Sequence, residues 1–273
     1  MQLGIFAKTF AGTTPLGVLQ AAADAGYGAV QYNMACSGGP ALPAEVSSET
    51  AQAVHAASRQ TGVAIAAISA TYNMTHPDLA KRQSGRASFA AIAAQAGAMG
   101  SRLLTVCSGS MDAQDQWRHH PDNATPDAWR AMIDEFHALV EIADQYDVLI
   151  GVEPELANIV STALKARTLI DSLRSDRIRI VLDPANLAEV APAEQRRAVI
   201  GDAVTLLADR IVMAHAKDRN ADGSFATAGK GVVDFPHFLG ALVQAGFDGS
   251  LVTHGLAAEE AAGVAAYLKS VLG

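Results

Sequence analysis

The stretch "DVLIGVEPE" (147–155) is an apolar run that ends in two glutamates on either side of a proline. A short, continuous apolar run of this kind is typical of a parallel strand that is covered on both faces. Ionised carboxylates seldom follow such a strand without a partner, because burial favours their neutral form. The stretch therefore predicts a buried parallel strand with polar chemistry at its carboxyl end.

The same pattern occurs seven more times along the chain. The other runs are "LGIFAK" (3–8), "GAVQYNM" (28–34), "VAIAAISA" (63–70), "RLLTVCS" (102–108), "IRIVLD" (178–183), "RIVMAHAK" (210–217) and "GSLVTHG" (249–255). Amphipathic helical stretches lie between them, and Thr14-Pro15 and Thr125-Pro126 are typical helix starts. Eight strand–helix pairs in 273 residues predict one α/β domain over residues 1–273, a single (β/α)8 TIM barrel. The alternative is a doubly wound open sheet, but no glycine-rich phosphate fingerprint follows the first strand.

Composition excludes several classes of protein. The formal net charge is −8 and no Lys/Arg cluster is present, which argues against a nucleic-acid partner. Only two cysteines occur, Cys36 and Cys107, so a disulfide framework is not expected. No run approaches the roughly 18 apolar residues of a membrane span, and the N-terminus does not read as a signal peptide. We therefore expect a cytoplasmic protein without a membrane partner.

Ionisable residues stand at the ends of the last four predicted strands. They are Glu153, Asp183, His215 and His254. In a barrel, strand ends surround one mouth, so these side chains are expected to converge there. Two carboxylates and two imidazoles suit one divalent metal ion, and Mn²⁺, Zn²⁺, Co²⁺ or Fe²⁺ better than Ca²⁺. Each residue taken alone has a structural alternative as an ordinary polar group.

Five short motifs occur in an order that resembles a known family. They are "GVEPE", "VLDPAN", "HAKD", "GKGVVDF" and "FDGSLVTHGL". Together they resemble the xylose isomerase-like TIM-barrel superfamily, and most closely its sugar (phosphate) isomerase/epimerase branch. The resemblance implies one divalent metal held by Glu153, Asp183 and His215, with His254 where the family has a second glutamate. In addition, Asn186 stands where the family often has a histidine.

The resemblance implies a metal-dependent enzyme that acts on a small sugar, keto-sugar or sugar acid. Its reaction would be isomerisation or epimerisation by proton transfer through an enediolate, with Glu153 as the base. His254 would be either a metal ligand or the acid that returns the proton, since neutral imidazole ligates and the cation donates. A lyase or dehydratase using the same site is the main alternative, and a non-catalytic sugar-binding barrel is another. A DNA phosphodiesterase is disfavoured by the acidic charge, and relatives in the family are often homo-oligomers.

Other polar residues near strand ends are candidates for binding the substrate. Lys217 lies two residues after His215 and should point the same way. The full set of candidates is Glu155, Asn186, Lys217, Asn73, His76, Trp117, His120, Asn158 and Lys230. Turn capping, loop packing and salt bridges are the alternative roles for these residues.

Overall fold

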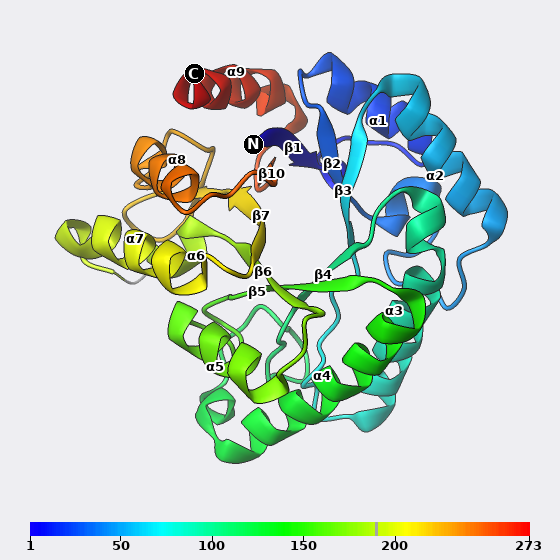
Figure 1. The fold of residues 1–273 in the computed structure, drawn as a ribbon, viewed down its shortest axis with the longest axis vertical. Helices are drawn as coiled ribbons and strands as arrows, with labels where there is room; N and C mark the ends of the chain where they lie inside the picture. Colours follow the sequence, from blue (N-terminus) through cyan, green and yellow to red (C-terminus); the bar gives the residue numbers. More distant parts are fainter. Residues whose placement is uncertain (189–190) are drawn as a thin grey trace.

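Eight parallel strands close into a barrel in the computed structural model, which describes residues 1–188 and 191–273. The order around the barrel is β1-β10-β7-β6-β5-β4-β3-β2, so each strand lies beside its neighbours in the chain, apart from a two-stranded insertion (Figure 1). The barrel strands are β1 (Gln2–Phe6), β2 (Ala29–Tyr32), β3 (Ala64–Ser69), β4 (Leu103–Cys107), β5 (Leu149–Glu153), β6 (Ile178–Leu182), β7 (Ile211–Ala216) and β10 (Ser250–Thr253). The predicted (β/α)8 barrel is confirmed, and seven of the eight predicted runs contain one of these strands, while β1 begins one residue before its run.

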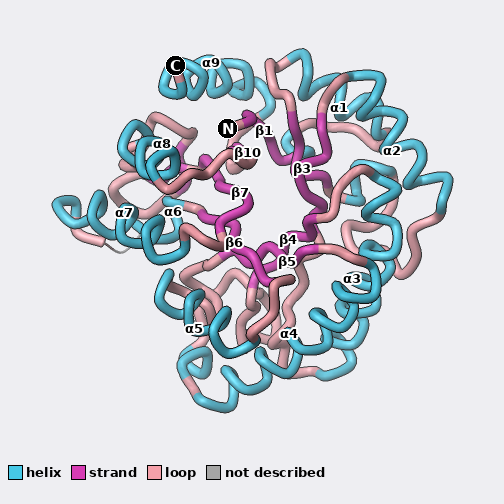
Figure 2. Tube along the Cα trace, in the orientation of Figure 1, coloured by secondary structure: helices cyan, strands magenta, loops and turns pink. Residues whose placement is uncertain are grey.

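Helices form a ring outside the strands, as Figure 2 shows in cyan around magenta. They are α1 (Pro15–Asp24), α2 (Ser48–Thr61), α3 (Leu79–Met99), α4 (Pro126–Tyr146), α5 (Ala163–Leu173), α6 (Pro184–Ala188), α7 (Arg196–Leu207), α8 (Phe235–Gln244) and α9 (Ala261–Leu272). The two predicted threonine caps are present, since the side chains of Thr14 and Thr125 accept hydrogen bonds from Gly17 N and Ala128 N.

Two short elements were not predicted from the sequence. Helix α6 follows β6 directly, and the antiparallel strands β8 (Asp218–Arg219) and β9 (Phe225–Ala226) form a hairpin in the long loop after β7. Both are too short to show a hydrophobic period, and the loop packing around them decides their structure. The hairpin reaches the barrel mouth, where its residues Arg219 and Phe225 line a cavity.

A plug of apolar side chains fills the middle of the barrel. It consists of Ala67, Leu103, Val181, Met213 and Val252, one from each of five strands. Side chains alternate along a strand, so the residue two positions further on points to the same side. Asp183, His215 and His254 each lie two residues after a plug residue, which places them in the next layer towards the mouth.

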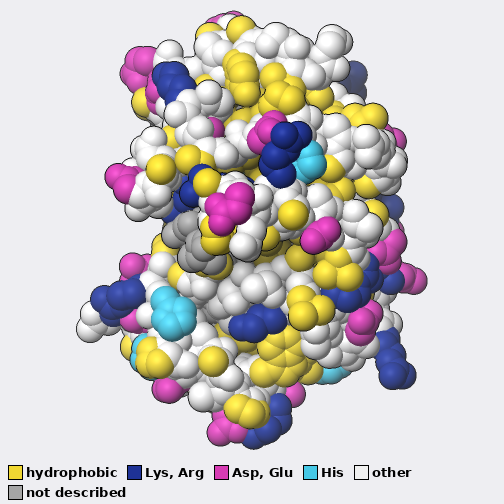
Figure 3. Space-filling model, turned by 90° about the vertical axis from the view of Figure 1, so that its left-hand side faces the viewer, with side chains coloured by type: hydrophobic (Ala, Val, Ile, Leu, Met, Phe, Trp, Pro, Cys, Tyr) yellow, Lys and Arg dark blue, Asp and Glu magenta, His cyan; other side chains and the backbone are white. Residues whose placement is uncertain are grey.

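The outer surface carries charges of both signs. On the face shown in Figure 3, Lys and Arg side chains lie scattered among acidic and uncharged ones. Over residues 1–188 and 191–273, none of the helices combines the length and the apolar character that crossing a membrane requires.

Candidate metal centre and active-site cavity

The four predicted metal ligands meet at the carboxyl ends of four adjacent strands. Glu153 ends β5, Asp183 follows β6, His215 lies near the end of β7, and His254 follows β10. One ligand atom from each residue lies within 4.8 Å of the corresponding atoms of the other three. Residues separated by up to a hundred positions in the chain thus form one cluster.

The contacts within the cluster link each carboxylate to an imidazole. Nδ1 of His215 lies 3.2 Å from Glu153 Oε1 and 3.8 Å from Asp183 Oδ2. Nε2 of His254 lies 3.3 Å from the same Asp183 oxygen. The two imidazole rings are 4.5 Å apart and meet edge to face. Asp183 is therefore the central acceptor of the cluster.

Side chains from the other half of the barrel orient His215. Its Nε2 donates to Gln31 Oε1 at 2.9 Å, and Gln31 Nε2 donates in turn to Thr105 Oγ1 at 3.0 Å. This bond fixes the ring and leaves Nδ1 directed at the carboxylates. A similar bond holds Glu153, since Asn186 Nδ2 donates to its Oε1 at 3.0 Å.

The charges of the cluster are strongly coupled. Burial alone would raise the pKa of Glu153 and Asp183, but His215 beside Glu153 and Lys217 beside Asp183 outweigh it, so both pKa values are lowered. Burial would lower the pKa of His215, but Glu153 and Asp183 raise it to about 9. Burial and the nearby His215 cation lower the pKa of His254. Both carboxylates are thus ionised, and His254 is neutral, at pH 7.

This arrangement fits a divalent metal ion. The cluster offers two carboxylate oxygens and two imidazole nitrogens, a mixed set suited to Mn²⁺, Zn²⁺, Co²⁺ or Fe²⁺. In the metal-free protein, two cations balance the paired carboxylates, protonated His215 and Lys217. A metal ion bound by Glu153, Asp183, His215 and His254 would replace that proton.

Lys217 and Glu155 lie beside the cluster. Lys217 Nζ donates to Asn186 Oδ1 at 2.6 Å and lies 3.2 Å from Asp183 Oδ2 and 4.0 Å from Glu155 Oε2. Burial raises the pKa of Glu155 to about 7, although Lys217 opposes the shift. The side chain of Lys217 therefore points towards the cluster, as its position two residues after His215 predicts. It also forms a salt bridge, which was the alternative role for this residue.

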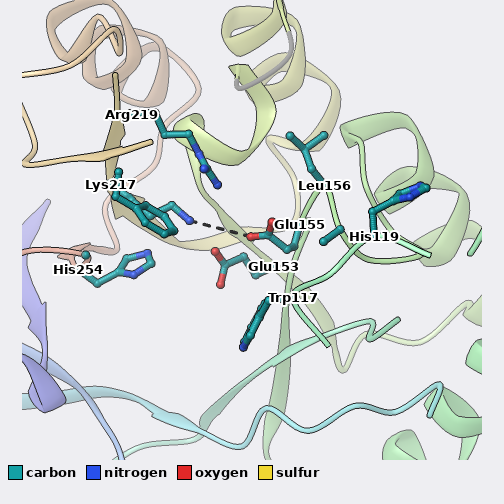
Figure 4. A pocket seen from close by; sticks show the side chains of 11 residues that line it. Trp117, His119, Glu153, Glu155, Leu156, Lys217, Arg219 and His254 are labelled. Atoms are coloured by element: carbon teal, nitrogen blue, oxygen red, sulfur yellow. Dashed lines mark ion pairs between the residues drawn. The ribbon is translucent and has the colours of Figure 1, made fainter. Parts of the chain in front are cut away.

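A cavity of about 830 Å³ opens directly over the cluster (Figure 4). It is lined by Trp117, His119, Glu153, Glu155, Leu156, Ala157, Lys217, Arg219, Phe225, His254 and Gly255. Of the four predicted ligands, only Glu153 and His254 line it. Asp183 and His215 lie behind them, with side chains 0% and 3% exposed. The two pairs thus have different access to a substrate.

Several predicted substrate-binding residues lie outside this cavity. Asn73 donates to Asp112 O and accepts from Ser110 N, while His76 bonds to Ala113 O and Asp78 N. These contacts hold together the loops after β3 and β4. For these two side chains the structure shows the alternative role of shaping a turn, and their binding of substrate stays a prediction.

Four further candidates also do not line the cavity. One is Asn186, which bonds to Glu153 and Lys217 and whose binding of substrate stays a prediction, and the other three lie in loops. Asn158 is buried and bonds to Gly109 N and Gln116 O. His120 caps a short 3-10 helix by accepting from Asp122 N, and Lys230 pairs with Glu260 at 3.2 Å. Each of them organises a loop near the mouth, and substrate binding by them stays a prediction as well.

Sequence reasoning missed Leu156, Ala157 and Gly255 of the cavity lining and five further residues of the site. The five are Gln31, Thr105, His119, Arg219 and Phe225. Gln31 had a usable signal, because it is a polar residue inside an otherwise apolar strand. Arg219 and Phe225 had none, because they belong to the unpredicted β8–β9 hairpin.

Solved structures with the same fold include several sugar epimerases. A 3-keto-D-glucoside 4-epimerase from E. coli is 15% identical with a TM-score of 0.79, and 99% of each chain is covered. A D-tagatose 3-epimerase-like protein is 17% identical with a TM-score of 0.78, covering 100% of this chain and 97% of the other. An L-ribulose 3-epimerase is 18% identical with a TM-score of 0.76, covering 100% and 93%. At these identities the likeness shows the fold.

Searches with the sequence itself give one positive and one negative result. Curated protein sequences contain no match. The profile of one family, described as xylose isomerase-like TIM barrel, matches residues 19–270. This is the superfamily that the five motifs resemble, and the match covers most of the chain. The chain belongs to the xylose isomerase-like TIM barrel family.

Proposed function

We propose that this protein is a divalent-metal-dependent isomerase or epimerase of a small sugar, keto-sugar or sugar acid. The observation that carries the proposal is the cluster of Glu153, Asp183, His215 and His254 at the base of a cavity of about 830 Å³. The names of the similar structures support the sugar class, since they describe sugar epimerases. We also propose that the protein is cytoplasmic, that residues 1–273 form one domain, that it assembles as a homo-oligomer and that it has no nucleic-acid partner.

The two cavity-lining members of the cluster are suited to move a proton. The lowered pKa of Glu153 keeps it ionised, so it can accept the proton from the carbon beside a substrate carbonyl. A bound metal ion would act as a Lewis acid and make that proton more acidic. His254 lines the same cavity, so its neutral form can serve as a ligand, and its protonated form can be the acid that returns a proton to carbon. The reaction returns the proton to carbon, and no redox partner is required.

Lys217 supplies a buried positive charge next to the reacting centre. Burial by itself would lower the pKa of Lys217. The carboxylates of Asp183, Glu153 and Glu155 raise it by more, so the net pKa is raised and the ammonium form is retained. A cation there stabilises negative charge on a substrate oxygen as the proton leaves carbon. Asn186 holds the ammonium group in place through its side-chain oxygen.

The test combines metal analysis with proton exchange. The purified protein should contain a divalent metal, and incubation with a panel of ketoses and keto-acids in D₂O should place deuterium on carbon. Glu153→Gln should reduce the exchange by at least about 10²-fold, the low end expected for a lost general base. Glu141→Gln on α4 is the matched control, because Glu141 is exposed and belongs neither to the cluster nor to the cavity lining.

The same assay separates the alternatives. A product lighter by one water would show a lyase or dehydratase. If the protein holds no divalent ion and Glu153→Gln changes no activity on any sugar, the enzyme proposal fails and a sugar-binding barrel takes its place. Salt-sensitive DNA binding would instead point to a nucleic-acid partner.

A further inference from the structure

The ammonium group of Lys217 lies between two carboxylates, one in the cluster and one in the cavity lining. Its Nζ is 3.2 Å from Asp183 Oδ2 and 4.0 Å from Glu155 Oε2. Figure 4 shows the side chain pointing towards Glu155, with a dashed line for that ion pair. Glu155 lines the cavity, whereas Asp183 lies behind it with a fully buried side chain. Lys217 thus connects the buried part of the cluster with the cavity.

Asp183 has one oxygen that is bonded to the backbone and one that is directed at the cluster. Its Oδ1 accepts from Ala185 N at 2.9 Å. Its Oδ2 lies 3.3 Å from His254 Nε2, 3.8 Å from His215 Nδ1 and 3.2 Å from Lys217 Nζ. A metal ion held by the two imidazoles would therefore bind Oδ2, the same oxygen that Lys217 contacts.

An ammonium group and a divalent ion on the same carboxylate oxygen repel each other. The repulsion between two charges about 4 Å apart is large where water does not screen them, and the side chain of Lys217 is only 5% exposed. The ion brings two positive charges, so the positive charge near Oδ2 increases even when one proton is released on binding. Lys217 therefore opposes metal binding as long as its ammonium group stays at Asp183.

Lys217 has a second partner within reach of a small movement. The stem of its side chain packs near Gly255, where an added Cβ would lie 3.5 Å from Lys217 Cγ. If Nζ moves by about 1 Å, its 4.0 Å separation from Glu155 shortens to a charge-assisted hydrogen bond. The bond from Nζ to Asn186 Oδ1, 2.6 Å long, can serve as the pivot. The ring of Phe225, whose centroid lies 5.5 Å from Nζ, also lines the cavity and favours a nearby cation.

We propose that Lys217 competes with the metal ion for Asp183, and that metal binding moves its ammonium group onto Glu155 in the cavity. This inference rests on the metal site of the proposed function. In the metal-free protein, Lys217 supplies part of the positive charge that the paired carboxylates require. In the loaded protein the metal ion takes that place, and the ammonium group faces the cavity. Metal loading therefore also positions the cation that a substrate meets.

Calorimetric titration of the chelator-treated protein with Mn²⁺ tests the competition. Lys217→Met keeps most of the stem and removes the charge, so Mn²⁺ should bind at least about tenfold more tightly than to the wild type. Lys165→Met is the matched control and should leave the affinity unchanged. The Lys165 ammonium group donates to Ile159 O and Ser161 Oγ and belongs neither to the cluster nor to the cavity lining. Equal or weaker Mn²⁺ binding by folded Lys217→Met would overturn the competition.

Crystal structures of the wild type with and without Mn²⁺ test the movement. With Mn²⁺ bound, the distance from Nζ to Glu155 Oε2 should shorten to about 3 Å, and the distance to Asp183 Oδ2 should exceed the roughly 4 Å of an ion pair. An ammonium group still in contact with Asp183 in the loaded protein would overturn the inference, whether or not Lys217→Met folds.

A double-mutant cycle measures the same movement in solution. Glu155→Gln should weaken Mn²⁺ binding by a larger factor in the wild type than in Lys217→Met, because only the wild type has an ammonium group that must find a new partner. Equal factors in both backgrounds would show that Glu155 acts on the metal ion directly, and the movement would be refuted.

The proposed function can fail separately. If no sugar shows deuterium exchange but Lys217→Met still binds Mn²⁺ more tightly, this inference stands and the proposed reaction is wrong. If exchange occurs and both proteins bind Mn²⁺ equally, the reaction stands and this inference is wrong. If neither protein binds Mn²⁺ or Zn²⁺, both are wrong.

Discussion

The two halves of the barrel end in different kinds of side chain. Strands β1 to β4 end in Phe6, Tyr32, Ser69 and Cys107, all uncharged, whereas β5, β6, β7 and β10 end in or are followed closely by Glu153, Asp183, His215 and His254. The first half contributes Gln31 and Thr105, which are neutral and reach the cluster only through His215. One half therefore carries the proposed ligands and proton-transfer groups, and the other half orients one of them through His215.

The largest effect should come from Asp183→Asn. Asp183 is the shared partner of His215, His254 and Lys217, and its side chain is fully buried. Loss of this ligand should reduce metal affinity by more than the about 10–100-fold expected for an orienting residue. It also removes one carboxylate from the buried cations Lys217 and His215, and breaking a buried ion pair in this way should cost about 3–5 kcal/mol of folding stability in the metal-free protein.

Calorimetric titration with Mn²⁺ or Zn²⁺ and urea unfolding would measure both effects. Asp134→Asn, at an exposed position of α4, is the matched control. If Asp183→Asn kept metal affinity within tenfold of the wild type, the cluster would not be the metal site, and the contrast between the two halves would lose its basis.

The next effect is a dependence of metal binding on pH. The metal-free cluster holds a proton on His215, whose pKa the carboxylates raise to about 9, and ligation requires the neutral imidazole. Apparent metal affinity should therefore increase about tenfold per pH unit as the pH rises towards 9, with release of about one proton. Titrations at pH 7 and 9, in buffers of different ionisation enthalpy, would measure this, and a flat profile would contradict it.

The same proton affects the stability of the metal-free protein with a defined sign. The pKa of His215 is higher in the folded chain, about 9, than the ordinary value of 6.5. Its contribution to folding stability is thus fully present below pH 6.5 and is lost as the pH rises through 9. Bound metal should remove this loss, because the imidazole is then neutral throughout.

Much of this architecture could be predicted from the sequence, because parallel strands covered on both faces leave continuous apolar runs. The four-residue cluster could be predicted for a related reason, since Glu153, Asp183, His215 and His254 interrupt or end those runs. Alternation along the strands then directs them into the layer above the apolar plug. The same alternation predicts that the side chain of Lys217, two residues after His215, points towards the cluster, where it contacts Asp183.

Loop side chains could not be placed in this way. Asn73, Trp117 and Lys230 all belong to loops near the mouth, but only Trp117 of these three lines the cavity. Asn73 bonds within the loops, and Lys230 pairs with Glu260. Sequence patterns do not show whether a turn residue faces a cavity or caps the turn, because both roles use the same residue types. Phe225 depends on a two-residue strand pair that leaves no periodic signal at all.

A smaller effect is expected from the orienting half of the barrel. Gln31→Leu keeps the approximate size of the side chain but removes the acceptor for His215 Nε2. Metal affinity should fall about 10–100-fold, as is typical when the outer partner of a ligating histidine is lost. Gln52→Leu on the exposed face of α2 is the control. A loss as large as that of Asp183→Asn would show that the two halves do not divide the work as proposed.

The smallest effect should come from Cys107, which ends β4 in the first half and contacts Glu153 directly. Its thiol contacts Glu153 Oε2 at 3.9 Å, and burial together with the Glu153 charge raises the pKa of the thiol well above its usual value. A neutral thiol at this distance donates only a weak hydrogen bond, so Cys107→Ala should leave metal affinity within about threefold and cost about 1 kcal/mol of stability. Alkylation of the native protein by iodoacetamide should likewise spare Cys107, since the thiolate is the nucleophile. If Cys107→Ala instead abolished deuterium exchange while metal binding persisted, and Cys107→Ser restored it, the first half would hold a proton-transfer group of its own. The thiol proton would then be the counterpart of Glu153, in place of His254.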